Sequence, residues 1–352
     1  MITLTRYPKE NRVLLNANPC TIKATTDNGA THYFRVVITV NDTVEIEESW
    51  SKLNNEVRID LKDFYKNRFA EILPAFDLEG FQRLDSLKIK VDVTINEYLL
   101  VDDSLIESVD APTFYMIQAA IPFVFDDLQK FQFLPGQLKT LNVSATSKVT
   151  FAFYLNTSSD LEYNLISDKE AVLKTGTLSN AASGIYVAQI DLTNIELTAK
   201  NYLKIGDGTT NFDQLVLTPF FNSIYSPTQL YFKNRNGIYL AATLFGQQEV
   251  EYNHTKEEYQ LADESYKTFS VKTETSIKVN TGHLFKQQLS LVKAINEALD
   301  LYMLYEGTYK MVQVISKKSA GFIDGEFLYS DTLEFAFQNN TPEDNSEKFE
   351  VV

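Results

Sequence analysis

The chain has 352 residues, of which 44% are hydrophobic and 22% are charged, and this balance excludes a wholly disordered protein. At about 150 residues per domain, the length predicts two or three domains. The net charge is −15 and the pI is near 4.7, so the surface would repel phosphate backbones and we expect no nucleic acid among the partners. The acidic residues are spread along the whole sequence, which indicates a solvated surface rather than an acidic patch.

Side chains that bind transition metals or form disulfides are scarce. Cys20 is the only cysteine, so an intrachain disulfide or a cysteine-based metal site cannot form, and we expect a buried structural thiol. The three histidines, His32, His254 and His283, lie far apart in the sequence. We therefore expect no metal and no cofactor.

We find no pattern typical of a targeting signal in this sequence. The first ten residues, MITLTRYPKE, lack the apolar core of a secretory signal peptide. No window approaches the ~18 to 20 continuous apolar residues of a membrane-spanning helix. We expect synthesis in a cytoplasm and no membrane span.

In the first third of the chain, His32–Val40 and residues 87–95 alternate between apolar and polar side chains, which predicts two half-buried strands. Between them, apolar residues recur at helical spacing over residues 61–73. Asp60 is placed as an N-cap and Pro74 as a stop. This region is therefore predicted to be β-rich with one short amphipathic helix.

The acidic stretch 102–112 (DDSLIESVDAP) ends in a proline and is predicted to be a domain boundary. Beyond it, short strands separated by turn signals are typical of a β-sandwich or barrel. The predicted strands are 115–125, 138–143, 148–155, 171–178, 184–192, 202–205 and 214–219. The polar residues 156–160 are predicted to form an exposed loop, as in jelly-roll lectins.

A second boundary is predicted at Ser226 and Pro227. Past it, Asn236-Gly237 within the turn 233–237 is a strong hairpin signal. An apolar stripe over residues 283–300 predicts the longest helix, with Thr281 as its cap. The strands predicted here are 229–231, 238–245, 268–279, 301–305, 309–316 and 325–337, followed by a polar acidic surface tail at 339–352.

Together these patterns predict a mainly β, multi-domain protein with a few helices. We expect an N-terminal β-rich domain at residues 1–110, a central β-sandwich at 111–226, and a C-terminal α+β domain at 227–352.

The sequence contains none of the common catalytic signatures: no GxSxG, no GxxxxGK[ST], no HExxH and no GxGxxG before a helix. We therefore expect a protein that is not an enzyme, with no catalytic, cofactor-binding or metal-binding residues. A pair of carboxylates for glycoside hydrolysis remains open, because 47 acidic residues always offer pairs and only their spatial separation would identify one.

Two polar clusters could carry chemistry. In residues 205–213 (IGDGTTNFD), acidic and polar side chains alternate as in a calcium loop, but Thr218 stands where the bidentate glutamate is needed, so a polar turn is favoured. Its alternating residues are Asp207, Thr209, Asn211 and Asp213. The carboxylates of Glu45, Glu47 and Glu48 beside Trp50 could form a sugar-stacking or catalytic face, but a solvated strand edge is favoured.

Three sequence features occur in a recognisable order. Asn18-Pro19 opens a β segment, residues 230–237 (LYFKNRNG) form a hairpin, and Asn280-Thr281-Gly282 heads a helix before a final Leu333-Glu334-Phe335 strand. This order resembles that of structural proteins of phages and prophages of Bacteroidetes-type bacteria. In that family the hairpin carries Trp-Leu where this chain has Tyr231-Phe232, and Lys233 intervenes before Asn234. The resemblance implies a virion component of the tail, baseplate or neck with no catalytic residues.

The leading hypothesis is a bacteriophage virion protein that forms a homo-oligomeric ring or hub, is made in the host cytoplasm, and has copies of itself and other virion proteins as partners. The alternative is a carbohydrate-binding host-recognition module, in which aromatic residues in loops such as 156–163 stack on host-surface glycan. Acid-pair hydrolysis ranks third.

Overall fold

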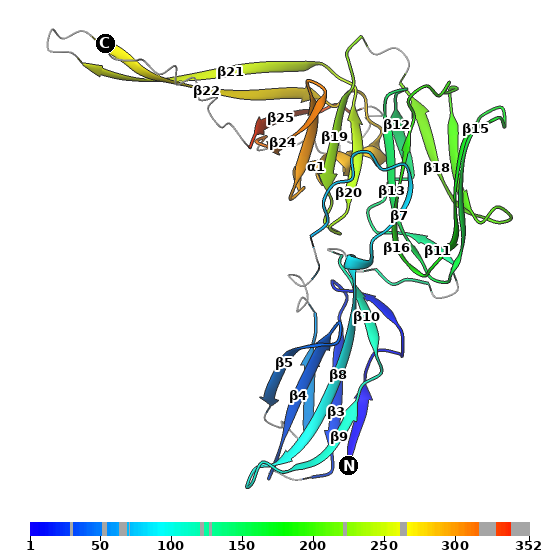
Figure 1. Cartoon of the computed structure of the whole chain (residues 1–352), viewed down its shortest axis with the longest axis vertical. Coiled ribbons are helices and arrows are strands. Elements are labelled where there is room, and N and C mark those ends of the chain that lie inside the picture. Colours follow the sequence, from blue (N-terminus) through cyan, green and yellow to red (C-terminus); the bar gives the residue numbers. More distant parts are fainter. Residues whose placement is uncertain are drawn as a thin grey trace, which may run out of the picture.

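The computed structural model describes residues 1–28, 31–50, 55–62, 69, 71–119, 123–126, 129–220, 224–260, 266–316 and 329–338. These residues form five β-sheets and one short α-helix, so the prediction of a mainly β, multi-domain protein is confirmed. Figure 1 shows an N-terminal module, a central sandwich and a C-terminal sheet from which a long hairpin extends.

The N-terminal module is a sandwich of two sheets. One sheet has the order β1 (Ile2–Arg6), β3 (Thr21–Thr26) and β6 (Glu56–Asp60). The other has the order β2 (Val13–Leu15), β10 (Phe114–Ile117), β8 (Lys88–Leu99), β4 (His32–Val40) and β5 (Thr43–Trp50), and β9 (Leu105–Asp110) also pairs with β8. Alternate side chains of β4 and β8, including Phe34 and Val93, are buried between the sheets, as their sequence alternation predicts.

The predicted boundary at 102–112 and the predicted helix at 61–73 both fall in this region. The acidic stretch 102–112 contains strand β9, which is hydrogen-bonded to β8, so it is part of the sheet rather than a linker. The stretch is acidic and most of its strand is exposed, which is why composition suggested a boundary. Most of the predicted helix 61–73 lies outside the described residues. Within its described part, Lys62 donates its backbone N–H to the carboxylate of Asp60 at 3.0 Å in a turn.

The central sandwich also consists of two sheets. One has the order β11 (Phe131–Phe133), β13 (Lys148–Leu155), β16 (Gly184–Asp191) and β7 (Gly80–Arg83). The other has the order β12 (Thr140–Val143), β18 (Asn211–Pro219), β17 (Asn201–Gly206), β14 (Ser159–Ser167) and β15 (Val172–Ala181). Phe151, Phe153, Leu165 and Leu215 are among the side chains buried between them. The seven strands predicted here are present, although the first, β10, ends at Ile117 and belongs to the N-terminal module.

Strand β7 connects the first third of the chain to the central sandwich. It follows β6 in sequence, pairs with β16 in register Gly80↔Gln189, and is followed by the 3₁₀ turn η1 (Asp85–Leu87) and by β8. The chain therefore leaves the N-terminal module, adds a strand to the central sandwich, and returns. The segments defined on the sequence do not correspond one to one with the sheets.

The C-terminal sheet has seven strands and carries helix α1 (Leu289–Asn296). Its order is β20 (Tyr239–Leu244), β19 (Thr228–Lys233), β23 (Leu301–Tyr305), β24 (Thr308–Val314), β25 (Thr332–Phe337), β22 (Tyr266–Asn280) and β21 (Gln248–Gln260). One apolar cluster joins this sheet to the central sandwich: it contains Tyr154 and Val187 as well as Leu230, Leu240 and Ile295.

Helix α1 is shorter than the predicted helix 283–300. Leu284 forms a β-bridge with Tyr329, which holds the start of that segment extended, and a 3₁₀ turn η2 (Lys286–Gln288) precedes α1. Thr281 does not cap α1, because its hydroxyl accepts the backbone N–H of Asp331 at 2.9 Å. The predicted tail 339–352 lies outside the described residues.

Candidate functional site

The calcium-like loop 205–213 is the turn between β17 and β18. One carboxylate oxygen of Asp207 accepts the backbone N–H groups of Thr209 (3.1 Å) and Thr210 (2.7 Å). The other forms an ion pair with Lys130 at 3.1 Å, and these contacts hold the pKa of Asp207 well below its usual range. The carboxylate is thus used inside the turn, which agrees with the polar-turn interpretation.

The carboxylates of Glu45, Glu47 and Glu48 lie on β5, the last strand in its sheet, so the predicted strand edge is confirmed. Arg35 on the neighbouring strand β4 lies 3.8 Å from Glu47. Trp50 at the end of β5 is half-buried and packs against the core of the N-terminal module. This packing makes Trp50 a structural residue rather than an exposed stacking platform.

Cys20 and the loop 156–163 also have structural roles. Cys20 is 2% exposed, and burial raises the pKa of its thiol to about 12, so the predicted buried thiol is confirmed. The expectation of exposed aromatic residues in the loop 156–163 is wrong for Tyr163. That side chain lies in β14 and is buried in the central sandwich, where its hydroxyl donates to Glu79 at 3.0 Å.

The three motifs behind the family resemblance lie where separate segments of the chain meet. The Asn18 side chain exchanges two hydrogen bonds with the backbone of Phe123, at 2.6 and 2.8 Å. The Asn236 amide donates to the carbonyl of Pro135 at 2.9 Å, across to the central sandwich. Gly237 has φ +77, and a Cβ there would lie 2.4 Å from the side chain of Gln118. These residues hold modules together.

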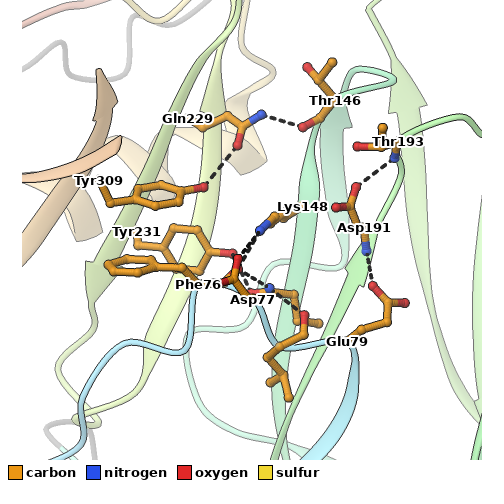
Figure 2. Close-up of polar contacts among 12 residues, drawn as sticks. Phe76, Asp77, Glu79, Thr146, Lys148, Asp191, Thr193, Gln229, Tyr231 and Tyr309 are labelled. Atoms are coloured by element: carbon orange, nitrogen blue, oxygen red, sulfur yellow. Dashed lines mark hydrogen bonds and ion pairs between the residues drawn. The ribbon is translucent and has the colours of Figure 1, made fainter. Parts of the chain in front are cut away.

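A polar cluster lies between the central sandwich and the C-terminal sheet and is shown in Figure 2. We call it the junction cluster; it contains Phe76, Asp77, Glu79, Lys148, Gln189, Asp191, Gln229, Tyr231 and Tyr309. At its centre is Phe76, in a turn that leads into β7 and is closed by the hydrogen bond from the Leu78 N–H to the Ala75 carbonyl at 3.2 Å. The Phe76 carbonyl accepts the ammonium of Lys148 on β13 and the amide of Gln189 on β16, the latter at 3.0 Å.

The ring of Phe76 contacts the opposite module. It stacks on Tyr309 of β24, with ring centroids 4.2 Å apart and planes 9° apart. It also makes edge contacts with Tyr231 at 5.2 Å and Tyr302 at 5.3 Å. Because its backbone is bonded to the central sandwich and its ring to the C-terminal sheet, this single residue fixes the two modules against each other (Figure 2).

Burial perturbs the tyrosines of the junction cluster. Burial, with nearby Asp77 and Asp191, raises the pKa of Tyr309 to about 12. Burial also raises the pKa of Tyr231 well above its usual range, although its hydroxyl donates to Gln189 at 2.6 Å. These shifts move the ionisation of both phenols further above neutral pH, where an ordinary tyrosine is already uncharged. The cluster can bind and orient chain segments, but it presents no nucleophile paired with a base.

The second notable feature is the hairpin of β21 and β22. The two strands pair from Gln248↔Val279 to Gln260↔Tyr266, whereas β25 pairs with β22 only over Ser276–Asn280. We call residues 252–260 and 266–275, which lie beyond the β25 pairing, the arm. Figure 1 shows the arm extending away from the rest of the molecule. On one face of the arm, Tyr252 is 59% exposed and Val271 is 55% exposed.

Within the part of the chain that the structure describes, no group of three or more His, Cys, Asp or Glu side chains is placed to hold a metal ion. In the same residues, no helix has the length and apolar character needed to cross a membrane.

No protein-family model matches this sequence, and no curated protein matches it. Solved structures match weakly. The fibronectin(III)-like modules of Clostridium thermocellum CbhA are 19% identical with a TM-score of 0.18, covering 33% of this chain and 94% of that chain. A Parabacteroides merdae β-glucuronidase is 8% identical with a TM-score of 0.18, covering 62% of this chain and 25% of that chain. The four N-terminal Ig domains of Dscam1 isoform 8.4 are 7% identical with a TM-score of 0.19, covering 80% of this chain and 68% of that chain.

The chain thus spans about a quarter of the length of the glucuronidase that it matches. The identities and TM-scores are too low to carry an argument about function, which therefore rests on the geometry of this chain.

Proposed function

We propose that this chain is a non-catalytic structural subunit of a bacteriophage virion, in the tail, baseplate or neck, and that it assembles with copies of itself into a ring or hub. The observation that carries the proposal is the arm. It extends about 30 Å beyond the last residues that β25 pairs, at about 3.4 Å per residue.

A two-stranded hairpin with no further strand and no core is marginally stable in water. Its edge strand also exposes unpaired backbone donors and acceptors. One face continues the buried side of the sheet, because Tyr252 and His254 follow Val250, which packs against the core. Burial of this face against a neighbouring subunit would supply the missing contacts.

Two further observations support a virion as the assembly. The order of the three motifs resembles that of phage structural proteins, and in this fold Asn18 and Asn236 of the first two motifs join separate parts of the molecule. The net charge of −15 disfavours contact with packaged DNA and favours an outer or tail position, with synthesis in the host cytoplasm.

Light scattering of the full-length protein tests the proposal. We expect an oligomer of defined mass, seen as rings by negative-stain microscopy. Replacement of residues 253–274 by an Asn-Gly turn should give a monomer with an unchanged melting temperature, because β21 and β22 keep their pairs beside β25. As a matched control, a shortened β14–β15 turn at residues 168–171 should leave assembly intact.

Mass spectrometry of virus particles purified from a host that carries the gene provides a second test. We expect the protein among the virion components. A full-length protein that stays monomeric at every concentration and is absent from such particles would contradict the proposal.

A further inference from the structure

A cavity of about 550 Å³ opens where the chain leaves the central sandwich and enters the C-terminal sheet. Small-molecule sites are commonly about 300 to 1,000 Å³ and often lie between modules. Its lining contains two kinds of side chain. We call Phe220, Tyr225 and Phe245 the aromatic wall, and Gln247, Glu249, Lys278 and His283 the polar wall.

The aromatic wall is held in place by both modules. The rings of Phe220 and Phe245 stack with centroids 5.0 Å apart and planes 27° apart. Phe220 donates its backbone N–H to the carbonyl of Val143 on β12 at 2.8 Å. Phe245 is buried, whereas Phe220 is half-buried and lines the cavity. The wall therefore presents a fixed apolar ring surface.

The floor is made of closely approaching backbone. A Cβ at Gly246 would lie 2.5 Å from the carbonyl oxygen of Asn280, so only glycine fits there. Gly246 donates its N–H to that same carbonyl at 3.0 Å, and Gly282 donates to the Asn280 side chain at 2.9 Å. The floor is thus ordered by contacts within the chain, which lowers the entropic cost of binding a ligand.

The polar wall offers hydrogen-bonding groups of several kinds. Glu249 on β21 lies opposite Lys278 on β22. The ammonium of Lys278 is ion-paired with Glu251, and this contact raises its pKa. The side chains of Gln247, Glu249 and His283 are exposed at the cavity. They supply a carboxylate and amide as acceptors and an amide and imidazole as donors.

We propose that this cavity binds a saccharide of one or two units, stacked by its apolar ring face on Phe220 and hydrogen-bonded through its hydroxyls to Glu249, Gln247 and His283. The exposed carboxylate, amide and imidazole favour a ligand that carries hydroxyl groups over a purely apolar one. Because Lys278 is ion-paired with Glu251, Glu249 leaves a negative charge at the cavity that disfavours a phosphorylated or otherwise anionic ligand. This inference goes beyond assembly and does not depend on it.

Saturation-transfer NMR with the full-length protein tests the site, using the methyl glycosides of glucose, galactose, mannose and N-acetylglucosamine and their β-linked disaccharides at millimolar concentration. We expect saturable transfer from at least one sugar, strongest at the protons of one ring face. Phe220→Ala and Glu249→Gln should each weaken binding by about tenfold. Glu48→Gln, which removes the same charge on exposed β5, should bind like the parent.

Three results would overturn the proposal. These are no transfer from any of the sugars, equal affinity in the parent and in the folded Glu249→Gln variant, and binding of benzylamine in preference to every sugar. Because Glu249 is exposed, its variant is expected to fold, and the oligomeric state measured on the same sample separates loss of sugar binding from loss of assembly.

Discussion

The junction cluster and the arm differ in what completes their contacts. At the junction, Phe76 is bonded through its carbonyl to Lys148 and stacked through its ring on Tyr309, so the contacts close within one chain. In the arm, Tyr252 and Val271 share an exposed face that no third strand of the described chain covers. From this difference we expect substitutions at the junction to change stability. We expect substitutions in the arm to leave stability unchanged and, on the proposed function, to change association.

The largest expected effect is the loss of the Phe76 ring. Phe76→Ala should lower the free energy of unfolding by about 3 kcal/mol, because the ring fills a site between three tyrosines. Tyr252→Ala in the arm should change it by less than about 0.5 kcal/mol. Urea denaturation of both variants measures the contrast. Equal effects would remove the distinction between the two regions.

A second substitution adds one methyl group on β15 of the central sandwich, next to Tyr163. In Gly176→Ala, the new Cβ would lie 2.3 Å from the ring of Tyr163, whose hydroxyl is bonded to Glu79 and limits its movement. We expect a loss of about 2 kcal/mol in the free energy of unfolding. Ser179→Ala, at an exposed position of the same strand β15, serves as the control and should be neutral. A stable Gly176→Ala protein would mean that Tyr163 can move.

A third, smaller effect concerns a single hydroxyl. Tyr231→Phe removes the 2.6 Å hydrogen bond to Gln189 and leaves a buried amide oxygen without that donor. The expected loss is about 1 to 2 kcal/mol, measured by the same denaturation. Tyr252→Phe in the arm removes an exposed hydroxyl that contacts Tyr305, and it should cost less than about 0.5 kcal/mol. If the two variants behaved alike, the Gln189 contact would contribute nothing to stability.

The smallest effect is a dependence on alkaline pH. Burial raises the pKa of Tyr309 to about 12, above the ordinary value of 10. Since the folded state favours the neutral phenol, this contribution is fully present below pH 10 and is lost as pH rises through about 12. The denaturation midpoint should therefore fall between pH 10 and 12. Tyr309→Phe should flatten that fall, and an unchanged slope would contradict the assignment.

Strands with regular alternation were predictable from the sequence. In β4 and β8, every second residue faces a core, so the local pattern reports the burial directly. Strand β21 (QEVEYNHTKEEYQ) was missed because both of its faces are largely polar, and its extended conformation depends on pairing with β22. The helix prediction was too long because the bridge of Leu284 to Tyr329 is a long-range contact.

The candidate sites were harder to predict. The Asn236-Gly237 turn was readable as a hairpin, but its contacts with Pro135 and Gln118 join residues far apart in sequence. Phe76 was missed because a single aromatic residue after Pro74 in an irregular segment carries no periodic signal. The cavity beside Phe220 is likewise lined by four separate segments, so no local motif marks it.

The position of β7, which belongs to the central sandwich but precedes β8 of the N-terminal module, affects folding during synthesis on the ribosome. Strand β7 emerges long before its partner, because β16 (Gly184–Asp191) follows about a hundred residues later, or about 5 to 20 seconds at ordinary elongation rates. During that interval the N-terminal module is tethered by a segment that cannot yet dock, and Phe76 has neither Lys148 nor Tyr309 to contact. The nascent chain is therefore most exposed to misfolding and chaperone binding after β7 and before β16 has been synthesised. The contact of Phe76 with Tyr309 can form only after the final third of the polypeptide has been synthesised.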